Sequence, residues 1–231
     1  MFEGFSQETI AFFAALRFNN NREFFEENRN VYENAVRKPL IALAEAVAPT
    51  VSAIDPQMDI RPARTVSRIH RDLRFRKDKT PYRDYMWIGF RHVGESREET
   101  CGFYFDISAE SANWGCGYYH MQPETMHNFR AKLRGEPKRV LKIIQAPAFR
   151  SSFSLMGDTY VRQYQPPEGM HKALGELYRK KSIYAEHHLR SMEDLFSPAL
   201  ADTIAQGFLA LKPFYAFLRE CMVKRIEEVD L

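Results

Sequence analysis

The sequence predicts an α+β fold in which a mostly antiparallel sheet, formed by the central third of the chain, is packed by N-terminal and C-terminal helices. Three observations support this prediction. Both ends of the chain show apolar residues at helical spacing, residues 64–121 carry short aromatic and β-branched runs, and the strand–helix alternation of a parallel sheet is absent. With 231 residues, 45% of them hydrophobic, the chain is long enough to form one substantial core. We therefore expect a single domain over residues 1–231.

Two helices are expected in the N-terminal part of the chain. Ser6 is placed to cap the first helix, which should end near Asn19. Asn20 and Glu23 have the spacing of a capping box, so they should start a second helix. The apolar stripe of this second helix continues beyond Pro39. We expect a kink there, because proline lacks the N–H group that an α-helix requires.

The remaining elements follow from the same patterns. Strands are expected at residues 63–71, 86–92, 100–108 and 112–121, an exposed loop at 163–169, and helices at 122–135 and 197–218. The last helix should begin with Ser197 as cap and Pro198 at its first position, and should bend at Pro213.

The basic residues are concentrated in one segment, "SRIHRDLRFRKDKTPYRDY" at residues 67–85. It holds seven arginine and lysine residues and three aspartates, an excess of four positive charges, whereas the net charge of the whole chain is only +3. If residues 64–72 form a strand, Arg68, His70 and Asp72 share one of its faces. The rest should form an ordered loop that Phe75 and Tyr82 anchor in the core.

Guanidinium groups donate forked hydrogen bonds that match phosphate and carboxylate groups, so this segment is a candidate anion-binding site. A second basic face lies on the helix after Pro123, where His127, Arg130 and Arg134 are spaced by three and four residues. The candidate ligand-binding residues are Arg68, Arg71, Asp72, Arg74, Lys77, Lys79, Tyr82 and Arg130.

Two alternatives remain open at this point. In the first, the chain is an enzyme that acts on a phosphorylated or acyl substrate, with His70 and Asp72 as an oriented acid–base pair and Arg68 or Arg74 stabilising negative charge. In the second, the charged segment is a purely structural lattice, in which its aspartates pair with its arginines.

Other classes of site lack the required motifs. The sequence has no Walker loop, dinucleotide-binding glycine fingerprint, GxSxG elbow or HExxH motif, and we expect no metal and no cofactor. The 33 basic and 30 acidic residues nearly balance, so an anionic small molecule is favoured over nucleic acid as the partner. Three widely spaced cysteines favour a reducing cytoplasm, and no apolar run approaches the length of a membrane span.

Several stretches together resemble a known family. These are "GFSQETIAFFAALRFNNNREFFEENRNVYENAVRKP", "SRIHRDLRFRKDKTPYR", "GYYHMQPETMHNFR" and "ALKPFYAFL". The chain is similar, from about Phe5 to Cys221, to the bacterial and fungal family catalogued as domain of unknown function 2461. The resemblance implies a single cytoplasmic α+β domain and supplies no activity. The family pattern has an aromatic residue where His70 stands, which favours the arginines, lysines and Tyr82 over His70 as site residues.

Overall fold

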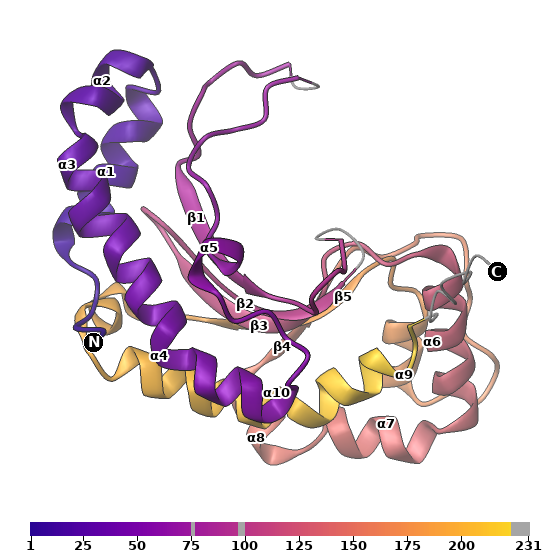
Figure 1. Ribbon diagram of the computed structural model, residues 1–231. Helices are drawn as coiled ribbons and strands as arrows, with labels where there is room; N and C mark the ends of the chain where they lie inside the picture. The colour runs from indigo at the N-terminus through magenta and orange to yellow at the C-terminus, as the bar shows by residue number, and fades with distance from the viewer. Residues whose placement is uncertain (75–76, 97–99, 223–231) are drawn as a thin grey trace, which may run out of the picture.

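The computed structural model of the chain describes residues 1–74, 77–96 and 100–222, and a five-stranded sheet lies at its centre (Figure 1). The strand order is β1-β2-β3-β5-β4, and every neighbouring pair is antiparallel. The strands are β1 (Tyr85–Phe90), β2 (Cys101–Ser108), β3 (Ala112–Tyr118), β4 (Ser154–Met156) and β5 (Ile183–His188). Helices precede and follow the central strands, so the predicted α+β class is confirmed.

The helices fall into two groups along the chain. The N-terminal group is α1 (Gln7–Phe18), α2 (Arg22–Glu27), α3 (Arg29–Val31), a π-helical turn (Tyr32–Arg37), α4 (Lys38–Ile54) and α5 (Pro62–Thr65). The C-terminal group is α6 (Pro123–Gly135), α7 (Pro137–Ile144), α8 (Pro147–Ser152), α9 (Lys172–Tyr178), a 3₁₀ helix (Met192–Phe196) and α10 (Leu200–Arg219).

The core lies between the sheet and helices α4 and α10, which run beneath the same face of the sheet (Figure 1). Alternate residues of β2 are fully buried because side chains of a strand point to opposite faces. Phe103 of β2 packs 4.9 Å from the ring of Phe208 and 5.0 Å from that of Tyr215, both on α10. The opposite face of the sheet, which carries Tyr104 and Glu186, is not covered by these two helices.

The second predicted helix is broken into several pieces. Asn21, not Asn20, caps α2 by accepting a hydrogen bond from the backbone N–H of Phe24. The predicted disruption at Pro39 takes the form of the π-helical turn Tyr32–Arg37, which directly precedes α4.

Pro39 also explains a buried contact with α1. Proline has no N–H, so the carbonyl of Ala35, four residues earlier, cannot receive the usual α-helical hydrogen bond from residue 39. The hydroxyl of Thr9, fully buried on α1, donates to this carbonyl at 2.6 Å. The irregular helix is thereby fastened to its neighbour.

The strand predicted at residues 63–71 does not form. Pro62 instead starts the short helix α5, since proline is well suited to a first helical position. Beyond it only isolated bridges occur, Val66 with Ile88 and His70 with Tyr82. The predicted alternation nevertheless holds, because Ser67 and Ile69 are buried while the residues between and after them are exposed.

Other element boundaries differ from the predictions. Strand β3 ends at Tyr118 instead of residue 121, and α10 begins at Leu200. Ser197 still accepts a hydrogen bond from the N–H of Ala199. The apolar residues at helical spacing along α10 are buried, namely Ile204, Phe208, Leu211, Tyr215 and Leu218. Strands β4 and β5 were not predicted at all. Residues 163–169 form a largely exposed loop, as expected.

Candidate functional site

The charged segment is an extended hairpin that continues from the edge strand β1. Its two arms are joined by backbone hydrogen bonds from Arg71 N–H to the carbonyl of Pro81 at 2.9 Å, and from Arg83 N–H to that of Ile69 at 2.8 Å. The side chain of Asn20 donates to the carbonyl of Tyr82 and accepts from its N–H, at 2.9 and 3.0 Å. The hairpin is therefore tied to the N-terminal helices, a role for Asn20 that the sequence did not reveal.

Arg71 is the centre of an internal charge lattice. Its side chain is only 12% exposed, and it donates to Asp78 and Thr80 at 2.7 Å each and to Asp84 at 3.1 Å. These contacts join the two arms of the hairpin. Arg71 therefore pairs with aspartates of the motif, as expected for the structural lattice.

Arg74 and Asp72 form a second pair within the hairpin. Their closest approach is 2.6 Å, and both side chains are more than half exposed. The hydrogen bonds from the Arg74 guanidinium lower the pKa of Asp72 to about 2. Lys77 and Lys79 are exposed, and Lys79 donates to the carbonyl of Leu73. Phe75, the predicted core anchor, lies outside the described residues.

The acid–base pair required by the enzyme alternative does not form between His70 and Asp72. Asp72 is engaged by Arg74, while the His70 ring lies against Phe25 and Tyr82, with centroid distances of 5.9 and 5.2 Å. The structure gives no hydrogen bond between these two described side chains. The imidazole is positioned by aromatic contacts instead.

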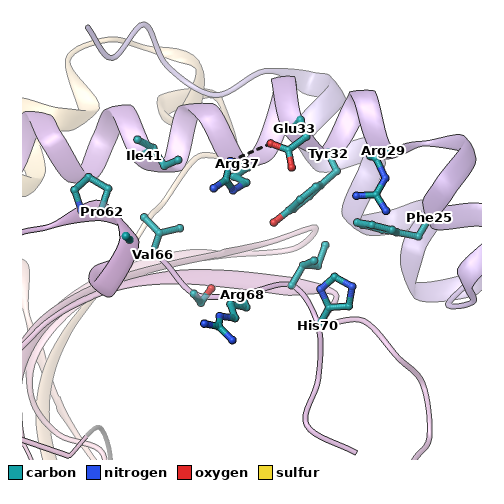
Figure 2. A pocket seen from close by; sticks show the side chains of 13 residues that line it. Phe25, Arg29, Tyr32, Glu33, Arg37, Ile41, Pro62, Val66, Arg68 and His70 are labelled. Carbon is teal, nitrogen blue, oxygen red and sulfur yellow. Dashed lines mark hydrogen bonds and ion pairs between the residues drawn. The ribbon is translucent and has the colours of Figure 1, made fainter.

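A groove of about 630 Å³ separates the N-terminal helices from the segment that leads into the hairpin (Figure 2). This volume is in the range of small-molecule binding sites. The helical wall is formed by residues of α2, α3, the π-helical turn and α4, and the opposite wall by residues 62–70. The groove thus joins the predicted charged motif to residues 25–41 of the N-terminal helices.

Aromatic rings form the base of this groove. Phe25 and Tyr32 line it and are almost fully buried, with 1% and 6% of their surface exposed. Tyr82 stacks on the other side of Phe25, with ring centroids 4.2 Å apart and an interplanar angle of 19°. Tyr82 therefore supports the groove from behind, and burial raises the pKa of its hydroxyl.

Exposed basic side chains surround the rings. Arg29 and Arg37 come from the helical wall, Arg68 comes from the opposite wall, and the His70 imidazole lies on that wall beside it. Arg29 pairs with Glu26 at 2.7 Å and Arg37 with Glu33 at 3.1 Å, and all four of these side chains are 38–51% exposed. Arg29 is held by two parallel hydrogen bonds to Glu26, whereas Arg37 makes a single exposed contact with Glu33. An exposed single-contact pair is weak, so Arg37 is available to a stronger anionic partner.

Arg68 differs from the other arginines of the motif. It is exposed and lines the groove, and among residues 1–74, 77–96 and 100–222 no carboxylate lies within ion-pairing distance of it. Its backbone carbonyl accepts a hydrogen bond from the guanidinium of Arg83 at 2.5 Å.

The structure does not bring Arg130 to this groove. Helix α6 and the charged hairpin lie on opposite sides of the molecule (Figure 1). The Arg130 guanidinium is buried, donates to the carbonyls of Tyr178 and Lys180 at 2.8 and 2.9 Å, and lies 3.6 Å from the ring centre of Tyr164. Burial lowers its pKa. The basic face of α6 therefore does not meet the central motif.

Sequence reasoning missed a polar network at one end of the core. Asp55 accepts hydrogen bonds from the hydroxyl of Tyr215 at 2.5 Å and from Nε2 of His92 at 2.7 Å. Arg219 donates to Nδ1 of His92 at 2.6 Å, and because a guanidinium cannot accept, the imidazole proton lies on Nε2. Arg219 also pairs with Glu95. No motif marks these residues, because they come from distant parts of the chain.

A second missed cluster lies on the sheet face that α4 and α10 leave uncovered. Glu186 accepts from the hydroxyl of Tyr104 at 2.6 Å, and its other oxygen lies 3.3 Å from His188. Asn113 contacts both His188, at 2.7 Å, and Asp106, at 3.0 Å. Burial and the nearby charge of Glu186 raise the pKa of Asp106 to about 6. The alternation of β2 would have placed Asp106 on this outward face.

Two further findings concern the described residues. They contain no group of three or more histidine, cysteine, aspartate or glutamate side chains placed to hold a metal ion. None of the helices formed by these residues is long and apolar enough to cross a membrane.

Comparison with known families gives one result of wide coverage. A family model described as "Conserved hypothetical protein (DUF2461)" matches residues 8–217 of the 231-residue chain. The chain therefore belongs to this family, and the resemblance seen in the sequence is confirmed. The comparison with curated proteins returns no match.

Proposed function

We propose that this member of the DUF2461 family is a binding domain for a small anionic ligand, in the simplest case one that bears a phosphate group. The ligand lies in the groove between the N-terminal helices and residues 62–70. Arg68 is its principal contact, Arg29 and Arg37 add charge from the helical wall, and His70 adds a further hydrogen-bonding group.

The observation that carries this proposal is the contrast between Arg68 and Arg71. Arg71 forms ion pairs with Asp78 and Asp84 of the hairpin itself, whereas Arg68 lines the groove and has no carboxylate partner among the described residues. Arg68 beside buried aromatic rings, together with Arg29 and Arg37 on the facing wall, forms a local excess of positive charge. An anion in the groove would supply the missing partner.

Among the other predicted residues, the structure suggests three different roles. Arg71, Asp72 and Arg74 hold the hairpin in shape, and Tyr82 supports the aromatic base. Lys77 and Lys79 lie further along the hairpin, where they contribute to attraction at a distance. Arg130 is not part of the proposed site.

The proposal is tested with a thermal-shift panel of inorganic phosphate, pyrophosphate, sugar phosphates, nucleotides and short DNA and RNA. The proteins are the wild type, Arg68→Ala and the control Arg64→Ala, which removes an exposed arginine that does not line the groove. A ligand at a hundred times its dissociation constant stabilises the protein by about 2.7 kcal/mol. We expect one anion class to stabilise the wild type and Arg64→Ala but not Arg68→Ala.

Two results would count against the proposal: no stabilisation by any anion, or equal stabilisation of Arg68→Ala and the wild type. Repeating the panel at higher salt separates the ligand classes. Binding of nucleic acid weakens steeply with salt because many phosphates are neutralised, while a single small anion held in a groove is less sensitive.

A further inference from the structure

The two ends of the groove differ in chemistry. Ile41, Pro62 and Val66 lie together at one end, whereas Arg29, Phe25 and His70 lie at the other (Figure 2). Ala63 also lines the groove beside Pro62. The apolar end therefore presents four hydrocarbon side chains. Ile41 comes from the first turn of α4, Pro62 and Ala63 come from α5, and Val66 directly follows α5.

None of the four side chains at the apolar end, Ile41, Pro62, Ala63 and Val66, carries a polar atom. Ser67, which follows Val66 in the chain and also lines the groove, is buried, and its hydroxyl accepts the backbone N–H of Trp87 at 3.0 Å. A sugar or a second phosphate placed against Ile41, Pro62 and Val66 would lose hydrogen bonds to water without replacement. A hydrocarbon group placed there would gain from the removal of apolar surface from water.

Charge is placed to hold the other part of the same ligand. Arg37 on the helical wall and Arg68 on the opposite wall lie between the two ends (Figure 2). Arg37 is held only by its exposed pair with Glu33, so it can turn toward an anion between the walls. Arg29 extends the charged part toward Phe25, and the His70 imidazole lies at the same end of the groove.

We infer that the ligand of this groove is a soluble amphipathic anion, with its acidic head group between Arg37 and Arg68 and a short alkyl or acyl chain against Ile41, Pro62 and Val66. This inference rests on the proposed function, because it takes the groove as the anion site. It adds the class of compound: the ligand is an organic anion with an apolar tail, and not a nucleotide or a sugar phosphate.

The experiment uses monoalkyl phosphates from ethyl to octyl, with the uncharged alcohols of the same chain lengths as matched compounds. Dissociation constants are measured by isothermal titration below the concentrations at which the longer compounds form micelles. The proteins are the wild type, Arg68→Ala and Val66→Thr, which keeps the side-chain shape but places a hydroxyl at the apolar end. Val93→Thr, at a valine 66% exposed and outside the groove, is the control for the same substitution.

For the wild type and Val93→Thr, we expect the affinity to rise about fourfold with each added methylene until the apolar end is filled, and then to stop rising. Val66→Thr should reduce this dependence on chain length and leave the binding of ethyl phosphate unchanged. Arg68→Ala should weaken every phosphate by a similar factor, and the alcohols should bind much more weakly than the phosphates.

The outcomes separate this inference from the proposed function. If all the phosphates bind equally and Arg68→Ala weakens them, the groove is an anion site but the amphipathic ligand is wrong. If no phosphate binds, the proposed function fails as well. Binding that grows with chain length equally for alcohols and phosphates, and that ignores Arg68→Ala, would show adsorption to apolar surface and would overturn both.

Discussion

Replacing Arg71 by alanine tests whether the hairpin depends on its internal charge lattice. The substitution removes hydrogen bonds to Asp78, Thr80 and Asp84, made by a side chain that is only 12% exposed. Hydrogen bonds to charged groups contribute about 1.5–3 kcal/mol when well shielded, but solvent reduces this because Asp78 and Asp84 are partly exposed. We expect a loss of about 2 kcal/mol in the free energy of unfolding. For a chain of this length, that lowers the melting temperature by about 4–8 °C.

The assay is thermal and urea unfolding of Arg71→Ala beside Arg68→Ala. Arg68 is exposed and has no described carboxylate partner, so its removal should change the free energy of unfolding by no more than about 0.5 kcal/mol. A double-mutant cycle of Arg71 with Asp84 should give a clear coupling energy. If Arg71→Ala melts like the wild type, or if the coupling energy is near zero, the division of the motif into lattice and ligand-binding arginines is wrong.

Three further predictions concern single contacts. Asn20→Ala removes both hydrogen bonds to the Tyr82 backbone and should lower the free energy of unfolding by about 2 kcal/mol, measured by urea titration. Thr9→Val should cost about 1–3 kcal/mol in the same assay, because it removes the buried hydrogen bond to the Ala35 carbonyl. Asp106 has a folded-state pKa of about 6, above its ordinary value of 3.8, so the folded protein loses stability as the pH rises between these values. Asp106→Asn should therefore match the wild type in free energy of unfolding near pH 3 and exceed it at pH 8 by at most about 3 kcal/mol. If the wild type at pH 8 is as stable as Asp106→Asn, or more stable, the raised pKa of Asp106 is contradicted.

The sequence predicted those elements whose pattern is local. The first helix and strands β1 and β2 could be located because a cap or a regular alternation of side chains lies within each segment. Strand β5 escaped because it ends in Glu186, His187 and His188, so its alternation is lost after three residues. Its stability comes from pairing with β3, about seventy residues earlier, which no local pattern records.

For the candidate site too, only the local features could be predicted from the sequence. The charged motif could be found from composition, but its division into paired and unpaired arginines depends on the register of the hairpin. Because the N–H of Arg71 bonds the carbonyl of Pro81, the Arg71 guanidinium reaches Asp78, Thr80 and Asp84 together. A shift of one residue would turn the side chains to opposite faces, and sequence alone does not fix that register.

The lattice and the groove are connected through the hairpin, and this has a consequence for ligand binding. Arg68 and His70 line the groove. Arg71 follows them in the same arm of the hairpin, and its side chain binds Asp78 and Asp84 of the opposite arm. Tyr82, held by Asn20, places its ring against Phe25 in the base of the groove. Loss of the lattice would therefore leave Arg68 present but less firmly placed.

Arg71→Ala should accordingly weaken anion binding indirectly, whereas Arg68→Ala removes a direct contact. The two effects on affinity should depend differently on temperature. In Arg71→Ala, moderate cooling stabilises the folded state and so restores the ordered hairpin. In Arg68→Ala, the missing guanidinium is not restored by cooling. Titrations at 10 and 25 °C should show the affinity of Arg71→Ala approaching that of the wild type at the lower temperature, with the deficit of Arg68→Ala unchanged. Equal deficits at both temperatures in both variants would mean that Arg71 contacts the ligand itself, and the assignment of roles within the motif would have to be reversed.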